Sequence, residues 1–291
     1  MRIAVYGNEY QQPHLDLIRR FIEILSGAPG TTLAFERTFG AYLTRHFALP
    51  PHATLPDSPP PQIDLALSFG GDGTVLRTAR AAAPAGIPVM GINTGHMGYL
   101  AATHLEDPED LAGIITGRRY EIDERAMLEV STDGFCSMRM FALNEVAVLK
   151  KDIASMISAA TAVDGHFMAT YRADGLLIAT PTGSTGYNLS AGGPIVAPRS
   201  PVFIITPVAP HSLTMRPVVV PDSVEVSIVA HSRADSFLLS VDGTSFTLAA
   251  GTPLRITKAP FNCRLARMSG KIFVDTLRDK LLWGMDTSGQ A

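Results

Sequence analysis

Apolar positions in the first part of the chain alternate between the spacing of strands and the spacing of helices. Three apolar runs predict buried strands, at residues 2–7, 65–69 and 88–93. Helices are predicted over residues 15–25, 35–47 and 108–117. The proline-rich residues 50–61 predict an exposed loop. Strands that alternate with helices in this way are typical of a doubly wound α/β domain.

From about residue 120 the pattern changes to short apolar runs joined by turns. Two hairpins are predicted around Asp133-Gly134 and Asp164-Gly165, and further strand-like runs follow them. We therefore predict an α/β domain over residues 1–120 and a β-rich domain over residues 121–270. Residues 273–283 return to helical spacing, and we expect them to pack back on one of the two domains.

The composition of the chain indicates which kinds of molecule it binds. The chain has 291 residues, with 24 basic and 27 acidic side chains and a formal net charge of -3. No run of like charge indicates a nucleic-acid tail or a membrane-binding face, so we expect a small-molecule partner and no nucleic acid. Two cysteines, Cys136 and Cys263, are too few for a disulfide framework or a zinc site and indicate a reducing compartment. Without a charged leader or a membrane-spanning apolar run, the chain is expected to be cytoplasmic.

The most informative stretch is residues 64–83, in which an apolar strand runs into Gly70-Gly71-Asp72-Gly73-Thr74 and then into a helix. Such a junction directs backbone N–H groups and the positive end of the helix dipole at one point, which favours phosphate binding. The stretch lacks the Lys of a P-loop and the third glycine of a dinucleotide fingerprint. Asp72 would repel a phosphate, so it indicates a second task, although an Asp-Gly pair can also be a simple turn.

A second unusual stretch, residues 174–196, is dense in hydroxyl groups and glycines. Hydroxyl and backbone groups on glycine turns can hydrogen-bond ribose, amide and phosphate groups, and Tyr187 could stack on a base. The alternative is a long connection that is rich in turns stabilised by Ser and Thr. Asn144-Glu145 is a pair of polar residues directly after an apolar run, which makes it a second candidate for ligand binding. The alternative is that the pair occupies an exposed strand position.

Taken together, these stretches resemble the NAD kinase family. The resemblance is carried by Gly70–Thr74, the turn at residues 94–100, Asn144-Glu145, residues 174–195 and Asp242-Gly243. In that family ATP and a divalent metal serve to phosphorylate the 2′-hydroxyl of the adenosine ribose of NAD, which gives NADP. The resemblance implies an α/β N-terminal domain and a β-sandwich-like C-terminal domain. It also implies that the last segment, 271–291, returns to the first domain, and that the chain forms a homo-oligomer, a dimer or a tetramer.

The same resemblance implies roles for individual residues. Asp72 would accept the proton of the ribose hydroxyl. The phosphates of ATP would lie against Gly70, Gly71, Gly73 and Thr74. Contacts to NAD would come from Gly73, Arg77, Asn144, Glu145, Arg172, Asp174, Thr185, Gly186, Tyr187, Asn188, Leu189, Ser190 and Thr244. Two positions depart from the common family pattern: Ser155, where many relatives have His or Arg, and Gly186, where many have Ala.

The sequence contains no set of His, Cys or carboxylate residues with the spacing of a structural metal site. We therefore expect Mg²⁺ to arrive with ATP and to keep several waters. His96, in the glycine turn, is expected to stabilise that turn. A lipid kinase would share the Gly70–Thr74 motif, but the polar cluster at residues 174–193 disfavours an acyl substrate. A sensor that binds NAD without turnover is the remaining alternative, and an assay of NADP formation distinguishes it.

Overall fold

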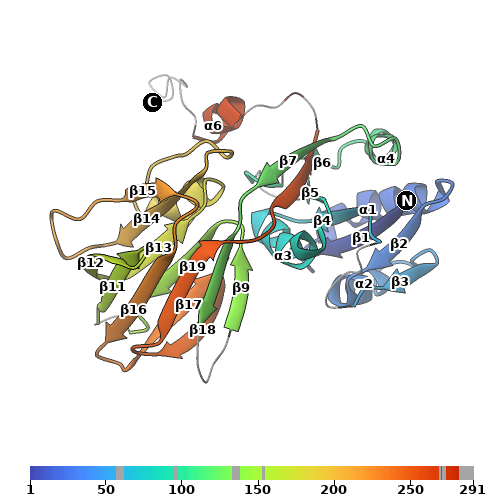
Figure 1. Cartoon of the computed structure of the whole chain (residues 1–291). Helices are drawn as coiled ribbons and strands as arrows, with labels where there is room; N and C mark the ends of the chain where they lie inside the picture. Colours follow the sequence, from blue (N-terminus) through green and yellow to red (C-terminus); the bar gives the residue numbers. More distant parts are fainter. Residues whose placement is uncertain are drawn as a thin grey trace, which may run out of the picture.

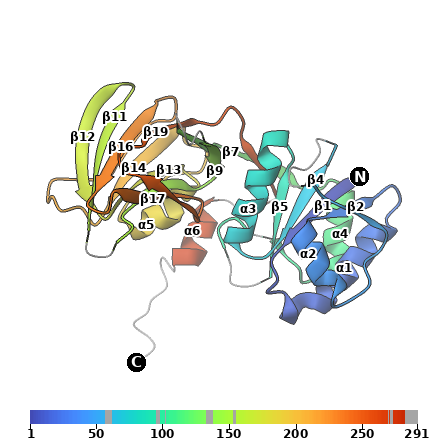
Figure 2. The ribbon, with the colours of Figure 1, turned by 90° about the horizontal axis from the view of Figure 1, so that it is seen from below.

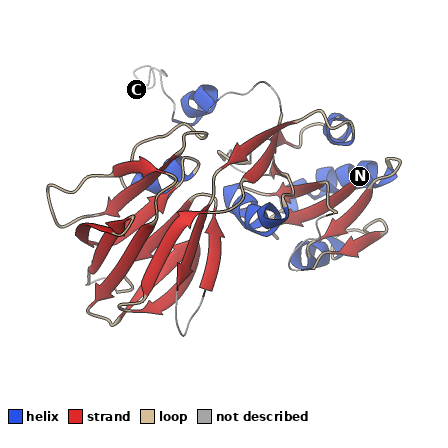
Figure 3. Cartoon of the chain, viewed as in Figure 1, coloured by secondary structure: helices blue, strands red, loops and turns tan. Residues whose placement is uncertain are grey.

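Two units built on different sheets lie side by side in the computed structural model (Figure 1). It describes residues 1–56, 62–94, 98–101, 103–132, 138–152, 155–268, 270 and 273–281. The first unit has helices around a mostly parallel sheet, whereas the second consists almost entirely of strands (Figure 3). The predicted fold class, an α/β unit followed by an all-β unit, is confirmed.

The first sheet has eight strands in the order β3-β2-β1-β4-β5-β20-β7, with β6 paired to β5. All its neighbouring strands run parallel except β7 and β20, which are antiparallel. The strands are β1 (Arg2–Gly7), β2 (Thr32–Phe35), β3 (His52–Thr54), β4 (Leu65–Phe69), β5 (Val89–Asn93), β6 (Thr103–His104), β7 (Glu121–Arg125) and β20 (Cys263–Arg267).

Helices cover both faces of this sheet, because its strands are apolar on both sides. Ile3 and Val5 of β1 face a core shared with α1, α2 and α4. Ala4 and Tyr6 of the same strand face a second core shared with α3. The α3 side is turned towards the second unit (Figure 2). The helices are α1 (Leu15–Gly27), α2 (Arg37–Thr44), α3 (Asp72–Ala82) and α4 (Pro108–Thr116), with short 3-10 turns η1 (Gln12–His14) and η2 (Ala83–Ala85).

Two short strands, β2 and the edge strand β3, were not predicted. The helix expected over residues 35–47 is the shorter α2, because the carboxylate of Glu36 accepts hydrogen bonds from the backbone N–H groups of Thr38 and Phe39 and so caps the helix there. β3 lies inside the segment expected to be an irregular loop, and its three residues are exposed. An exposed strand of three residues carries no apolar alternation, which is why its sequence does not predict it. Residues 57–61 of that loop lie outside the described residues.

The second unit is a pair of six-stranded antiparallel sheets, in the orders β15-β14-β13-β10-β17-β18 and β12-β11-β16-β19-β8-β9. Alternate side chains of both sheets meet in one apolar core. The strands are β8 (Leu128–Thr132), β9 (Met138–Ala142), β10 (Glu145–Leu149), β11 (Ile157–Val163), β12 (His166–Ala173), β13 (Gly175–Ala179), β14 (Val202–Val208), β15 (Val218–Pro221), β16 (Val226–Ser232), β17 (Ser236–Val241), β18 (Thr244–Ala249) and β19 (Pro253–Lys258). Between β13 and β14 lie the turn η3 (Gly183–Thr185) and the short helix α5 (Tyr187–Ser190).

The two units are joined by neighbouring segments, because β7 leaves the first sheet and β20 returns to it. The expected boundary at residue 120 therefore precedes β7, which still belongs to the first sheet, and the chain re-enters that sheet at Cys263 rather than at 271. A last helix, α6 (Phe273–Leu281), follows, and Figure 2 shows it near α5. None of the helices in the described ranges is both long and apolar enough to cross a membrane.

The predicted Asp-Gly turn at residues 164–165 is confirmed, and both residues have the positive φ of a tight hairpin. Asp242-Gly243 forms the same kind of turn between β17 and β18. Asp133-Gly134, Cys136 and His96 lie outside the described residues.

Candidate active site

The phosphate-binding loop predicted at residues 70–74 lies at the carboxyl end of the parallel strands, where Gly70 and Gly71 follow β4 and residues 72–74 begin α3. Gly70 has a φ of +146, and a Cβ there would lie 2.5 Å from the Oγ1 of Thr74, so only glycine fits. Gly71 and Gly73 have nothing within 4 Å of the place where a Cβ would stand. The loop is therefore closed on the Gly70 side and open at Gly71 and Gly73, where a ligand can approach the start of α3.

Asn8 supports the loop on the side of Gly70. We did not identify this residue from the sequence. Its side-chain N–H donates to Thr74 Oγ1 over 3.1 Å. Arg77, one turn further along α3, donates to the carbonyl of Gly7. Thr74 and Arg77 therefore hold the end of β1 against the loop. The only signal that could have identified Asn8 is its place directly after a buried strand.

Asp72 is the first residue of α3, and its carboxylate holds the segment that follows β5. Oδ2 accepts from the N–H of Tyr99 (2.7 Å), and Oδ1 accepts from the N–H groups of Leu100 and Ala101 (both 3.0 Å). A Cβ on Gly98 would stand only 1.8 Å from Oδ1. Asp72 is thus half-buried, fixed in one orientation and next to the open glycines of the loop.

Asn144 and Glu145 lie where β9 leads into β10, and Asp242 organises the backbone there. The Asp242 carboxylate accepts from the N–H groups of Leu143 (2.7 Å), Asn144 (2.9 Å) and Glu145 (3.1 Å). Burial raises the pKa of Asp242, and the three N–H groups oppose that rise. Burial, and then the nearby charge of Asp242, raise the pKa of Glu145 to about 7. Two ionisable carboxyls are therefore held close together in a site largely removed from water.

The side chains of Asn144 and Glu145 contain polar atoms that the described residues do not satisfy. Asn144 Oδ1 and Glu145 Oε2 are buried and have no hydrogen-bond partner among those residues. Buried polar atoms are normally hydrogen-bonded, so an acceptor without a partner indicates a place for a ligand group or a water. The two unsatisfied oxygens therefore indicate that a ligand binds beside Asn144 and Glu145.

The loop after β13 packs directly on this pair. A Cβ on Gly183 would stand 2.1 Å from the carbonyl oxygen of Asn144, so the two backbones touch. A Cβ on Gly186 would stand 3.2 Å from Glu145 Oε2 and 3.3 Å from Asn144 Nδ2. Gly186 therefore faces the unsatisfied Oε2 of Glu145. Thr185 donates its hydroxyl to the carbonyl of Thr182 over 3.3 Å, which helps to shape the turn η3.

The short helix α5 follows Gly186 directly. Tyr187 and Ser190 are exposed and Leu189 is half-buried, so these side chains remain accessible. Asn188 differs, because its amide N–H₂ donates to the carbonyls of Ser184 and Pro194 and its Oδ1 accepts from Thr206. Its side chain is fully buried. These bonds hold the loop together, and the predicted contact of Asn188 with NAD stays a prediction.

Thr244 connects the two units at the other side of the site. Its Oγ1 accepts from Arg80 Nη1 of α3 over 2.9 Å. The charge of Arg80 also opposes the raised pKa of Asp242. The α3 helix that begins at Asp72 thus reaches the turn that organises Asn144 and Glu145.

Arg172 and Asp174 are not brought to this site within one chain. Antiparallel pairing places Glu145 of β10 opposite Ala179 of β13, and Leu149 opposite Gly175. Five residues at about 3.3 Å each put Asp174 about 17 Å from the Glu145 end of these strands. Asp174 forms an ion pair with Lys150 over 2.9 Å.

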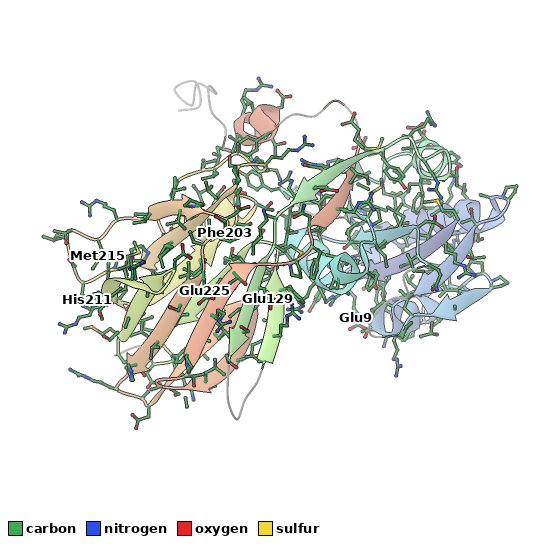
Figure 4. All side chains as sticks on the ribbon, in the orientation of Figure 1. Glu9, Glu129, Phe203, His211, Met215 and Glu225 are labelled. Atoms are coloured by element: carbon green, nitrogen blue, oxygen red, sulfur yellow. The ribbon has the colours of Figure 1, made fainter. Side chains whose placement is uncertain are left out.

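Arg172 and Asp174 instead line a pocket of about 700 Å³. Its other lining residues include Ser155, His211 and Met215. Figure 4 labels the last two at the end of the second unit that lies away from the first. Ser155, which with Gly186 departs from the common family pattern, therefore belongs to this pocket and not to the site around Glu145.

Comparison with known proteins covers both units. A model of the ATP-NAD kinase N-terminal domain matches residues 50–119, and a model of the ATP-NAD kinase C-terminal domain matches residues 143–268. An NAD kinase of Bacteroides fragilis is 40% identical over 289 residues, which cover 99% of each chain. The chain belongs to the NAD kinase family.

Further relatives of this NAD kinase family member agree in sequence and in fold. An NAD kinase of Porphyromonas gingivalis is 39% identical, over 97% of this chain and 98% of its own. A crystal structure of yeast NADH kinase complexed with NADH has a TM-score of 0.89 at 22% identity, and covers 100% of this chain and 90% of that one. A structure of an NAD kinase from Archaeoglobus fulgidus in complex with ATP has a TM-score of 0.71 at 28% identity, covering 92% and 94%.

The resemblance to the family implies a divalent metal, and the described residues show which donors the chain could offer to it. No group of three or more His, Cys, Asp or Glu side chains in the described ranges could hold a metal ion. The described part of this NAD kinase family member therefore does not supply a metal cage of its own.

Proposed function

We propose that the chain transfers the γ-phosphoryl group of ATP to the 2′-hydroxyl of the adenosine ribose of NAD, with Asp72 as the acceptor of the hydroxyl proton. The overall reaction, from ATP and NAD to ADP and NADP, is that of the NAD kinase family to which the chain belongs. The observation that carries the assignment of Asp72 is its fixed carboxylate at the start of α3, beside the open Gly71 and Gly73. A base must lie within hydrogen-bond reach of the proton that it takes, and a carboxylate beside the glycines where the phosphates would bind supports this assignment.

The two carboxylate oxygens of Asp72 bind backbone N–H groups, and one of them can also accept the proton of the ribose hydroxyl. Among the described residues, Oδ1 accepts two N–H bonds and Oδ2 accepts one. A carboxylate oxygen has two lone pairs, so Oδ2 keeps a position for the ribose hydroxyl. In the transfer the O–H bond breaks and its proton passes to Oδ2. The ribose oxygen bonds to the γ-phosphorus, and the bond from that phosphorus to the β-phosphate oxygen breaks, which releases ADP.

Phosphoryl transfer depends mainly on positioning the two nucleotides and on stabilising phosphate charge. We assign the phosphates of ATP to the backbone of Gly70, Gly71, Gly73 and Thr74. These groups lie at the positive end of α3. A divalent metal such as Mg²⁺ would neutralise phosphate charge, and since the described residues form no cage for it, its ligands would be phosphate oxygens and water.

We assign the adenosine of NAD to the site around Asn144 and Glu145. Their unsatisfied buried oxygens can accept hydrogen bonds from the hydroxyl groups of a ribose or the amino group of a base. Tyr187, exposed at the start of α5, can stack on the base. The remaining proposed NAD contacts around this site are Gly73, Arg77, Thr185, Gly186, Leu189, Ser190 and Thr244.

The distance to Arg172 and Asp174 supports a homo-oligomer, a dimer or a tetramer. Asp174 lies about 17 Å from the Glu145 end of β10 and β13, too far to contact the same ribose, and Arg172 lines the same pocket as Asp174. Their pocket is open and lined by several charged side chains. We propose that this pocket takes part in nucleotide binding by a neighbouring copy of the chain. Arg172 and Asp174 would then contact the NAD bound to that copy.

The test is formation of NADP by the purified chain with NAD, ATP and Mg²⁺, measured with a dehydrogenase that accepts only NADP. We expect the wild type to form NADP, and Asp72→Asn to keep its fold and bind NAD but to lose at least about a hundredfold in turnover. Asp16→Asn, an exposed acid in the first turn of α1, is the matched control and should keep the wild-type rate. A near-normal rate for Asp72→Asn would remove Asp72 from the mechanism. Binding of NAD without NADP formation by the wild type would identify a sensor instead.

A further inference from the structure

A buried ionic cluster lies where the first unit meets the loop that covers Glu145. Asp123 and Arg125 are two apart on β7, so both side chains point to the same face, and they are only 8% and 5% exposed. The Asp123 carboxylate accepts two hydrogen bonds from Arg125, at 2.9 and 2.6 Å. It also accepts from Arg199 (3.0 Å) and Arg267 (3.2 Å). One carboxylate therefore holds three guanidinium groups in a fixed arrangement.

Arg125 also makes a hydrogen bond outside its ion pair with Asp123. Its Nη1 donates to the Oγ1 of Thr182 over 3.1 Å, across 57 residues of sequence. Thr182 precedes η3, and its carbonyl accepts from the hydroxyl of Thr185. Gly183, the next residue, touches the backbone of Asn144. A strand of the first sheet is thus bonded through one guanidinium to the loop that we assign to NAD.

The same guanidinium lies beside the segment that Asp72 holds. A narrow hollow of about 20 Å³ is lined by Tyr99, Leu100, Arg125, Thr182 and Thr185, together with residues of α6. The N–H groups of Tyr99 and Leu100 are bonded to Asp72. Arg125 therefore stands where the segment bonded to Asp72 meets the loop at residues 180–186.

We propose that Arg125 is a positioning residue for phosphoryl transfer: oriented by Asp123, it holds the loop at residues 180–186 at a fixed distance from Asp72. The proposal rests on the proposed function, since it concerns the rate of that transfer. A fork of N–H groups is needed, because Arg125 must bond to Asp123 and Thr182 at once, and the single ammonium of a lysine does not reproduce that geometry. A displacement of about 1 Å in such an arrangement can cost about a hundredfold in rate.

The test uses three single variants, the double variant that combines Arg125→Lys with Thr182→Val, and one control. Arg125→Lys keeps the charge but loses the fork, Thr182→Val removes only the hydroxyl at similar volume, and Thr182→Ser keeps the oxygen. Arg139→Lys is the matched control, because Arg139 makes a two-bond ion pair with Glu129 on the exposed edge of the second unit. For each variant kcat, the KM for NAD and the melting temperature are measured.

We expect Arg125→Lys and Thr182→Val each to lower kcat about tenfold or more, with a change of less than about threefold in the KM for NAD. The double variant should be no slower than the slower single variant, because both remove the same contact. Thr182→Ser and Arg139→Lys should keep the wild-type kcat. A purely structural role would lower the melting temperature and leave kcat per folded enzyme unchanged.

Wild-type kcat in Thr182→Val, or effects that multiply in the double variant, would overturn the proposal. The two Thr182 variants decide the question if Arg125→Lys does not fold. If the wild type formed no NADP, the proposed function would fail separately. Amide hydrogen exchange over residues 180–186 would then test the contact itself: faster exchange in Thr182→Val supports it, and unchanged exchange refutes it.

Discussion

Glu145→Gln should make the free protein more stable at pH 8 and less able to bind NAD. Glu145 Oε2 is buried without a partner among the described residues, and burial together with Asp242 raises the pKa of this carboxyl from 4.5 to about 7. Above pH 7 the folded protein therefore holds a carboxylate that water would solvate better. Glutamine has nearly the same shape and carries no charge, so the variant avoids this cost.

The size of the effect follows from the linkage between protonation and folding. The pKa is raised in the folded state, so the contribution of the protonated carboxyl to stability is fully present below about pH 4.5 and is lost as the pH rises to about 7. A rise from 4.5 to about 7 corresponds to about 3 kcal/mol. We expect Glu145→Gln to raise the free energy of unfolding by about 3 kcal/mol at pH 8 but by only about 1 kcal/mol at pH 5.

Thermal unfolding without nucleotides at pH 5 and pH 8 measures this difference. The gain at pH 8 corresponds to roughly 5–10 °C in melting temperature for a protein of this size. Glu23→Gln, at an exposed position of α1, should change neither melting temperature. A Gln variant that is no more stable at pH 8 than the wild type, or that gains equally at both pH values, would refute the reasoning. Titration with NAD should in addition show weaker binding, because the amide replaces one acceptor oxygen by a donor.

Two glycine substitutions test close approaches at the site. Gly98→Ala places a Cβ 1.8 Å from Asp72 Oδ1, so it should displace the carboxylate and lower NADP formation about tenfold or more, while NAD still binds. Gly183→Ala places a Cβ 2.1 Å from the Asn144 carbonyl, and thermal melts should show a loss of at least about 1–3 kcal/mol because neither backbone can yield cheaply. Gly27→Ala, where nothing lies within 4 Å, should be neutral in both assays. Wild-type behaviour of either site variant would mean that its segment adjusts more freely than the packing indicates.

Patterns that are local in the chain were predictable from the sequence. The strand, glycine turn and helix start around Asp72 lie within twenty residues, and apolar periodicity shows each part of them. The hairpin at Asp164-Gly165 is equally local, because two residues with positive φ determine the turn. The division into an α/β part and a β part likewise follows from whether the apolar period is close to four or to two.

Contacts between distant parts of the chain were decided only by the tertiary structure. Asp242 supports Asn144 from 98 residues away, and Arg125 reaches Thr182 across 57, and no local pattern shows which partner a carboxylate or guanidinium will find. The antiparallel register of β10 and β13 separates Asp174 from Glu145, although both belong to stretches with the same family resemblance. Sequence spacing shows which face of an element a residue occupies. The order and direction of the strands determine which site that residue joins. They depend on the burial of apolar side chains that are far apart in the sequence.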